Sequence, residues 1–488
     1  MEKIKQYLKN NYIYLFLISC ILFAIPSIIY IIQNGTIFKF DTYFKFLLNG
    51  TDRIGQTIIY LAVLVLMTFF YWKIIKNREK IFKDNNSIFI WITIISLIFV
   101  LVIPFMCSDI FYYLGVGRLA SNYDQNPYYV TIKDFVQTQA NSDELLGHDT
   151  VLYQGYLNDW ADSTVVYGPI WTIICQLIAG ISFGNIDIGL LLFKLLNVIV
   201  HILNAYMIFK ISGKKIFVLL YGLNPFILIE GISSVHNDIF VVFFVLLSLY
   251  FLLKKRKLFL SILFLALATC IKYFTIILLP FIIIYYFREE KPKVRLLKCI
   301  KYGIIFLIII LVPYLIYIKD LNVFAGLFTQ QGKLAKSIYI LISEYFVSPQ
   351  GLVNTLKNTL LGIFSIIYIT FCIILINKKN IEFRNEMKNA NYFIMAFLFL
   401  LITNFQPWYI MWIFPLIIWQ KAGNIRWIIE ISLIAEFANS IFLAYGEGWR
   451  NGTPFIFALF VGSLGILILD GKIKKNRQIK CFRRKEIG

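Results

Sequence analysis

One aspartate stands at the end of an apolar segment, in a position suited to acid–base chemistry. Asp109 follows the apolar segment 87–106 almost directly. A carboxylate at such a point is partly shielded from water, and a positioned carboxylate is a common general base for activating a hydroxyl group. Tyr112, Tyr113 and Arg118 follow it, which favours a binding segment over a simple helix cap. Asp109 is therefore the candidate catalytic base.

A lone lysine is the second feature with chemical potential. Lys272 interrupts the apolar stretch 258–287, at a turn expected on the outer side of a membrane. A cation near membrane depth costs up to about 3 kcal/mol and usually marks a functional site. Its best partner would be an anionic phosphate at the interface. The alternative is a snorkelling lysine that has no partner.

Three consecutive polar residues occupy another outer turn. His236, Asn237 and Asp238 lie between two apolar segments, where they could hydrogen-bond a sugar or a phosphate. A divalent metal site and a plain polar turn remain alternatives. The seven cysteines form no Cys-x-x-Cys pair, so neither a disulfide framework nor a metal knuckle is predicted.

A fourth turn combines an amide, a proline and two aromatic rings. It reads Gln406-Pro407-Trp408-Tyr409. A rigid turn of this kind suits stacking against a sugar face. An interfacial aromatic belt, which Trp and Tyr favour in any membrane protein, explains the same residues equally well.

The composition defines the class of protein in which these residues must be positioned. Of the 488 residues, 59% are hydrophobic and 15% are charged, whereas soluble proteins carry about 45–50% apolar and about 25% charged residues. The net charge of +20 arises from 47 basic and 27 acidic residues. The basic residues lie in short clusters between apolar segments, as in polytopic membrane proteins. Nucleic-acid binding, a disordered chain and a cytosolic enzyme are therefore excluded.

Apolar segments of sufficient length, together with three shorter hairpins, predict an all-α protein with about 14 transmembrane helices. The single spans are 12–32, 56–75, 87–106, 188–209, 302–318, 359–376, 427–445 and 454–470. The hairpins are 216–232 with 238–253, 258–270 with 273–287, and 391–404 with 408–420. Basic residues flank the open ends of each hairpin, so each is expected to cross the membrane and return.

The distribution of charge predicts that both termini are cytoplasmic. The segments assigned to the inner side hold 35 of the 47 Lys and Arg residues, and the outer segment 108–168 has two basic and eight acidic residues. If the apolar stretch 169–183 crossed the membrane, every later basic cluster would lie outside. We therefore expect a re-entrant or interfacial helix there. The candidate residues then share the extracytoplasmic face.

Loop lengths exclude further classes. No inner segment exceeds about eighteen residues, which is too short for a nucleotide-binding domain built from βαβ units of about thirty residues each. An ATP-driven pump and a transferase with a cytosolic nucleotide-sugar domain are excluded. We expect one integral domain, 1–488, with a helix pair at 12–75, a core at 87–420 that includes outer loop 108–187, and a C-terminal helix pair with a basic tail at 421–488.

The order of the motifs resembles the GT-C superfamily of integral-membrane glycosyltransferases, and most of all the bacterial polyprenol-phosphate-mannose-dependent mannosyltransferases. The similarity covers roughly residues 87–420. It rests on Asp109 with Tyr112, Gly117-Arg118 and Asn126-Pro127-Tyr128, then Tyr167-Gly168-Pro169, Asn224-Pro225, His236-Asn237-Asp238, Lys272 and Gln406-Pro407-Trp408-Tyr409.

The resemblance implies a donor in which a hexose, most often mannose, is linked to polyprenyl phosphate and presented outside. It also implies that the first outer loop carries helices lying on the bilayer, and it aligns Asp109 with the catalytic acid of the superfamily. Many members have a paired carboxylate there. This chain has Ser108 before Asp109, so a second carboxylate or a divalent metal at this point is open.

These inferences combine into one mechanism, inverting sugar transfer with Asp109 as base. Lys272 and Arg118 are expected at the donor phosphate. Sugar or acceptor binding is assigned to Tyr112, Tyr113, His236, Asn237, Asp238, Gln406, Trp408 and Tyr409. The acceptor would be a glycan, glycolipid or protein of the cell envelope. A transporter or flippase of lipid-linked glycans is the alternative, and a non-catalytic assembly partner is a third reading.

Overall fold

The structure, a computed structural model, describes residues 2–34, 53–104, 107–331, 337, 339, 342, 350–419 and 425–445. Within these ranges the chain is built from helices and forms no β-strand. The predicted all-α class is therefore confirmed. The predicted span 454–470 and the basic tail 471–488 lie outside the described residues.

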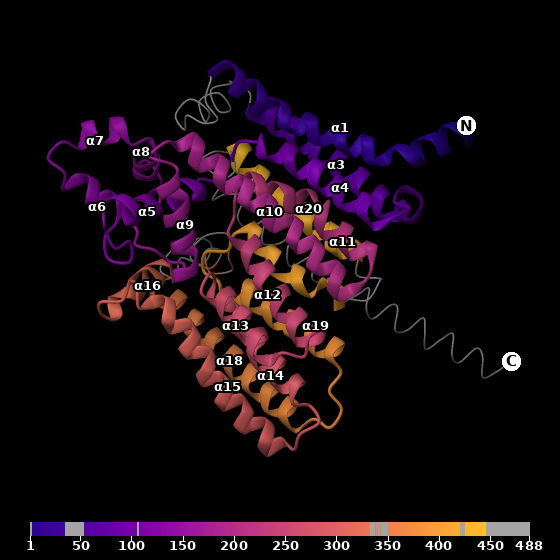
Figure 1. Cartoon of the computed structure of the whole chain (residues 1–488), viewed down its shortest axis with the longest axis vertical. Helices are drawn as coiled ribbons and strands as arrows, with labels where there is room; N and C mark the ends of the chain where they lie inside the picture. Colours follow the sequence, from indigo (N-terminus) through magenta and orange to yellow (C-terminus); the bar gives the residue numbers. More distant parts are fainter. Residues whose placement is uncertain are drawn as a thin grey trace.

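A layer of long helices forms the N-terminal part of the molecule. It comprises α1 (Glu2–Asn34), α3 (Arg53–Ile81) and α4 (Asn85–Val100), with α10 (Ile186–Ser212) and α20 (Ile425–Tyr445) packed against them. Figure 1 shows α1 and α3 running alongside α4, with α10 and α20 beneath them. The predicted helix pair 12–75 thus packs on α4 of the predicted core and on α20 of the predicted C-terminal part.

The predicted outer loop folds into a cluster of shorter helices at one end of the molecule (Figure 1). They are α5 (Asp109–Asn122), α6 (Ile132–Gln137), α7 (Ser142–His148), α8 (Thr150–Tyr156) and α9 (Pro169–Ile181). Helices α5 and α9 approach closely because Gly117 has no side chain. A Cβ atom at Gly117 would lie 2.2 Å from the carbonyl oxygen of Cys175.

The remaining helices form the core around the candidate residues. They are α11 (Lys215–Gly222), η1 (Ile227–Ser233), α12 (Asp238–Leu253), α13 (Leu258–Thr269), η2 (Tyr273–Leu278), α14 (Leu279–Tyr286), α15 (Pro292–Tyr314), η3 (Leu321–Phe324), α16 (Ala325–Gln331), α18 (Gln350–Asn377), α19 (Phe383–Ala396), η4 (Phe397–Leu401) and η5 (Pro407–Trp419). Elements η1 and η4 are π-helices, and η2 and η5 are 3₁₀ helices. Such departures from α geometry are frequent at functional sites.

Five helices within the described ranges are long and apolar enough to cross a membrane, or six if the bent pair of α11 and η1 is one span. Six further apolar helices have 10–17 residues, among them Pro169–Ile181, which is α9. The protein is therefore polytopic, but the predicted count of fourteen is not confirmed. Helix α9 packs along α5 in the outer-loop cluster, and its re-entrant or interfacial placement stays a prediction.

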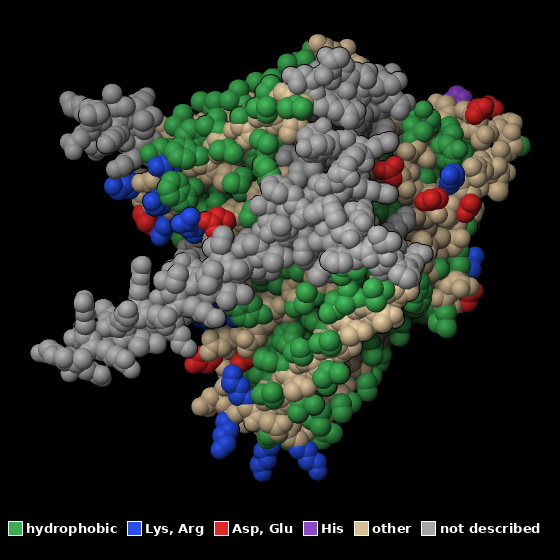
Figure 2. All heavy atoms as spheres, turned by 180° about the vertical axis from the view of Figure 1, so that it is seen from behind, with side chains coloured by type: hydrophobic (Ala, Val, Ile, Leu, Met, Phe, Trp, Pro, Cys, Tyr) green, Lys and Arg blue, Asp and Glu red, His purple; other side chains and the backbone are tan. Residues whose placement is uncertain are grey.

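Charged and apolar side chains occupy different parts of the molecular surface. In Figure 2 most of the visible lysines and arginines lie at the left and lower edges, and the acidic residues of the outer-loop cluster lie at the right edge. Between them, α15 and α18 expose isoleucine and leucine side chains such as Ile308, Leu311, Ile366 and Ile367. This apolar exterior is suited to contact with lipid.

Candidate active site

The segment between α4 and α5 places Asp109. Lys194 of α10, fully buried, donates its ammonium to the carbonyl oxygen of Val100 at 3.2 Å and to that of Val102. This contact satisfies carbonyls at the end of α4, which otherwise lack partners. Asn158 donates to the carbonyl of Ser108 at 2.7 Å. These contacts fix the chain at Val100, Val102 and Ser108, and Asp109 is the first residue of α5.

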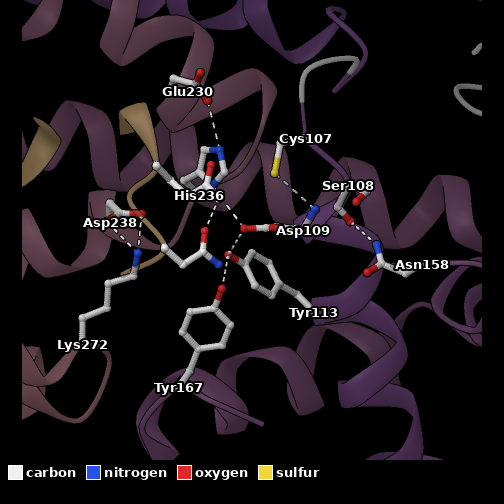
Figure 3. A network of polar contacts seen from close by, with 12 residues as sticks. Cys107, Ser108, Asp109, Tyr113, Asn158, Tyr167, Glu230, His236, Asp238 and Lys272 are labelled. Atoms are coloured by element: carbon white, nitrogen blue, oxygen red, sulfur yellow. Dashed lines mark hydrogen bonds and ion pairs between the residues drawn. The ribbon is translucent and has the colours of Figure 1, made fainter. Parts of the chain in front are cut away.

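Two tyrosines of the outer-loop cluster lie against Asp109 (Figure 3). The hydroxyl of Tyr113 donates to Asp109 Oδ2 at 3.4 Å, and the hydroxyl of Tyr167 lies 3.3 Å from that of Tyr113. Burial, followed by the neighbouring Tyr167, raises the pKa of Tyr113 well above its ordinary value. Burial, followed by the charge of Asp109, does the same to the pKa of Tyr167. Both phenols therefore stay protonated and act as donors near the carboxylate.

His236 lies between two carboxylates. Its Nε2 atom is 3.0 Å from Glu230 Oε2, and its Nδ1 atom is 3.7 Å from Asp109 Oδ2. The ring is fully buried and stacks on Trp408 with ring centroids 4.0 Å apart. The preceding residue, Val235, has φ 58°, a left-handed conformation that is unusual for a β-branched side chain. Strained backbone of this kind clusters at functional sites.

One group of side chains could hold a metal ion. The donor atoms of Cys107, Asp109 and His236 lie within 4.8 Å of one another. The amide of Asp109 also donates to Cys107 Sγ at 3.4 Å. Thiolate, imidazole and carboxylate are ligands that zinc accepts, and Glu230 on the second ring nitrogen is the usual outer partner of a histidine ligand. The residues therefore fit a divalent metal ion.

Lys272 and Asp238 form a buried ion pair. The ammonium of Lys272 lies 2.8 and 2.9 Å from the two oxygens of Asp238. The Asp238 side chain is fully buried and that of Lys272 is 10% exposed. The indole N–H of Trp412 also donates to Asp238. The first residue of α12 thus anchors the lone lysine of the next hairpin.

Aromatic rings enclose the ammonium of Lys272. It lies 4.5 Å from the centroid of the Tyr409 ring and 5.4 Å from that of Trp412, distances suited to cation–π attraction. Trp412 stacks between Tyr409 and Phe274, with centroids 4.7 and 3.7 Å away. Tyr167 approaches from the outer-loop cluster, at 6.0 Å.

The Tyr167-Gly168-Pro169 motif joins the outer-loop cluster to the Lys272 turn. The amide of Gly168 donates to the carbonyl of Ile271 at 3.3 Å. A Cβ atom at Gly168 would lie 2.3 Å from the carbonyl oxygen of Cys270. Only glycine allows this close approach of two backbones, which holds the Tyr167 ring beside Lys272.

A cavity of about 340 Å³ opens next to Lys272. Its polar lining includes Lys272, Lys357 and Asn404, and Tyr167, Tyr409 and Trp412 supply aromatic surface. Leu361 of α18 with Phe397 and Leu401 of η4 form an apolar wall. The cavity therefore combines cations with an apolar side, and the Asp109–His236 pair lies behind the Tyr113–Tyr167 contact.

The predicted residues fall into two groups. Asp109, Tyr113, His236, Asp238, Lys272, Trp408 and Tyr409 belong to this connected network. The side-chain amide of Asn237 is buried beside it, and no hydrogen-bond partner for that amide lies within the described residues. Gln406 donates to Asn404 Oδ1 at 2.8 Å and so supports a residue that lines the cavity.

Two predicted residues have other partners. The Tyr112 hydroxyl donates to the carbonyl of Ser163 at 3.0 Å. Arg118 forms an ion pair with Asp149 at 2.5 Å, and both side chains are largely buried. Asp149 also accepts from Tyr123 at 2.7 Å. Both predicted residues brace the outer-loop cluster, and their predicted substrate contacts stay predictions.

The sequence assigned no role to three residues of the network and the cavity lining. Glu230 lies within an apolar segment, and an acid there is itself a sign of function. Lys357 lies at the outer end of a predicted span, where a lysine is disfavoured. Cys107 carried no signal, because a thiol within apolar sequence is usually a small hydrophobe.

Comparisons with known proteins agree on one class of enzyme. Residues 20–288 match the profile of a family described as alpha-(1->6)-mannopyranosyltransferase, N-terminal domain. Over 131 residues the chain is 28% identical to alpha-(1->6)-mannopyranosyltransferase A of Corynebacterium glutamicum. That alignment covers 26% of this chain and 26% of the relative, so the matched part spans about a quarter of its length. No solved structure matches.

Proposed function

Because the chain belongs to the alpha-(1->6)-mannopyranosyltransferase family, we propose that it transfers mannose from a polyprenyl-phosphate-linked donor to a cell-envelope acceptor. The membership confirms the resemblance to mannosyltransferases that the order of motifs indicated. The matched range 20–288 contains Asp109, His236 and Lys272. The observation that carries the proposal is the continuous network that joins these three residues, in which Lys272 and Tyr167 line one cavity.

The cavity supports a lipid-linked donor. Its cationic side, with Lys272, suits a phosphate, and the aromatic rings of Tyr409 and Trp412 suit a sugar face. The wall formed by Leu361, Phe397 and Leu401 suits the apolar tail of a prenyl chain. A nucleotide-sugar, which is fully water-soluble, would make no use of this wall.

Asp109 is the base in this mechanism. Its carboxylate takes the proton of the acceptor hydroxyl while the hydroxyl oxygen bonds to the anomeric carbon of mannose. The bond from that carbon to the phosphate oxygen breaks, and polyprenyl phosphate leaves with the electron pair. One displacement inverts the configuration at the anomeric carbon. Lys272 counters the charge that grows on the leaving phosphate, a contribution made by preorganised cations in many transferases.

The surrounding residues position the reactants. His236 lies 3.0 Å from Glu230 and stacks on Trp408, and its other ring nitrogen lies 3.7 Å from Asp109. The unpartnered amide of Asn237 is a candidate donor and acceptor for sugar hydroxyls. If a divalent metal binds at Cys107, Asp109 and His236, it would supply a Lewis acid beside the acceptor oxygen.

The reaction would take place at the outer face, with both termini in the cytoplasm. This orientation is supported by the positive-inside rule, since the basic clusters lie at the far end of the helices from the acidic outer-loop cluster (Figure 2). We propose one integral domain, in which 12–75 and 421–488 flank the catalytic core 87–420. Residues 446–488 of the C-terminal part lie outside the described residues.

Lys194 and Glu436 are charged residues within apolar segments, which would also suit a transporter, but both have internal partners. Lys194 caps α4, and Glu436 accepts a hydrogen bond from Tyr60 at 2.9 Å. These contacts are structural, so they add nothing to the transporter alternative.

The test is transfer of labelled mannose from polyprenyl-phosphate mannose to an α-mannoside acceptor by purified protein in detergent or nanodiscs. Asp109→Asn should lower kcat by about 10²–10⁴-fold, the usual contribution of a general base. Asp143→Asn, at an exposed position on α7, is the control and should keep full activity. Full activity of the Asp109 variant would remove the base assignment. Absence of transfer by the native protein from this donor, with transfer from a nucleotide-sugar, would remove the donor assignment.

A further inference from the structure

Lys272 by itself is poorly equipped to hold a phosphate. A lysine ammonium has three N–H donors. Two of them lie on Asp238 at 2.8 and 2.9 Å (Figure 3), so one remains for an incoming oxygen. The carboxylate also cancels the charge of the ammonium. A phosphate diester that becomes a monoester on losing its sugar gains negative charge, and that charge requires a second cation.

Lys357 is a second cation on the same cavity. It lies on α18 and lines the cavity together with Lys272. Its side chain is half-buried, and no carboxylate pairs with it within the described residues. The neighbouring Asn358 and Leu361 line the cavity as well, so this turn of α18 borders it.

The cavity lining is positive. Lys272 and Lys357 are both present, and no aspartate or glutamate of the described residues lines it. The remaining polar groups include the amides of Asn358 and Asn404, which can donate to oxygen. An anionic headgroup is therefore the ligand that this lining selects.

Lys357 lies beside the apolar wall of the cavity. Leu361 follows it by one turn on α18, and Phe397 and Leu401 of η4 complete the same wall. Helices α18 and η4 pack against each other, and α18 exposes a large apolar surface to the exterior. A phosphate at Lys357 would therefore leave its esterified lipid beside apolar side chains on the route to the bilayer.

We propose that Lys357 is a donor-binding residue that contacts the phosphate of the polyprenyl-linked substrate from the side opposite the Asp238–Lys272 pair. This inference rests on the proposed function and names the residue that gives the site its affinity for a lipid phosphate. Lys272 provides one N–H at the reacting end of the phosphate. Lys357 provides an uncompensated charge at the end that carries the lipid.

The experiment measures binding, so that it is independent of turnover. The full-length protein in nanodiscs is titrated with a C50 polyprenyl phosphate that bears no sugar, and Trp fluorescence reports binding because Trp412 lines the cavity. Lys357→Met removes the charge and keeps the length of the side chain. It should weaken binding about tenfold or more, the usual worth of a hydrogen bond to a charged group. Lys357→Arg should restore most of the affinity.

Three comparisons make the test decisive. Lys379→Met alters an exposed lysine just beyond the other end of α18 and should bind like the native protein. The matching polyprenol, which lacks phosphate, should bind equally to the native and Lys357→Met proteins. Inorganic phosphate should compete with the lipid only weakly, which would identify the lipid phosphate as the ligand.

Two results would overturn the inference. One is unchanged polyprenyl phosphate affinity in Lys357→Met. The other is an equal loss of affinity for polyprenyl phosphate and polyprenol, since that would reflect packing and not charge. A protein that binds the lipid phosphate through Lys357 but transfers no mannose would contradict the proposed function and leave this inference standing.

Discussion

The ion pair between Lys272 and Asp238 permits a sharp test of the network. The perturbation is a cycle of Lys272→Met, Asp238→Asn and the double variant. Asp238 is fully buried and Lys272 is 10% exposed, so either single change leaves a buried charge without its partner. Breaking such a pair costs about 3–5 kcal/mol. Asparagine keeps an acceptor for the indole of Trp412, so the second single change isolates the charge.

The double variant contains no unpaired charge. It should therefore be less stable than the native protein by only about 1–3 kcal/mol, the cost of an imperfectly satisfied amide. The two sites should be coupled by about 3 kcal/mol or more. Transfer of mannose should stay lost in the double variant, because Lys357 contacts the lipid end of the phosphate and no group replaces the N–H of Lys272 at its reacting end.

Stability is measured by thermal unfolding in one detergent, and activity by transfer of labelled mannose. A double variant whose loss of stability equals the sum of the two single losses would refute the pairing. A double variant that regains transfer would refute the role of Lys272 at the leaving phosphate.

Two further predictions concern the outer-loop cluster. Asp149→Ala leaves Arg118 without a carboxylate and removes the N-cap of α8, where Asp149 accepts from Leu152 N–H at 2.9 Å. Thermal unfolding should show a loss of stability of about 3–5 kcal/mol, and an unchanged Tm would contradict this. In Gly168→Ala the new Cβ would lie 2.3 Å from the Cys270 carbonyl oxygen, so the change should displace Tyr167 from Lys272 and lower mannose transfer. Gly147→Ala, at a position with open space, is the control and should keep full activity. Equal activity of the two variants would show that the close contact at Gly168 is unimportant.

The sequence predicted the class of fold because membrane insertion depends on composition and charge distribution. Helical apolar segments and basic clusters are local properties, and they are read directly from the chain. The number of spans was harder. Segments of 10–17 residues, such as Asp238–Leu253, are shorter than a bilayer requires, so length and composition do not assign them.

The sequence predicted which residues belong to the candidate site, but not which of them contact one another. Asp109, His236 and Lys272 stood out because each is a polar residue beside apolar segments. The ion pair between Asp238 and Lys272, 34 positions apart, depends on helix packing and has no local sequence signature. The same is true of the ion pair between Arg118 and Asp149. Lys357 lies at the outer end of a predicted span, but its partners could not be predicted, because its cavity forms only when η4 packs on α18.

The left-handed backbone at Val235 has a consequence for how the enzyme would fail. A conformation of this kind costs about 1–3 kcal/mol and persists only while its surroundings enforce it. Here those surroundings are η1 on one side and α12 on the other. If either element loosens, the bend relaxes, and the imidazole of His236 swings away from both carboxylates. Inactivation by an unsuitable detergent would then precede melting of the helices, and a sample with full helical content could already be inactive.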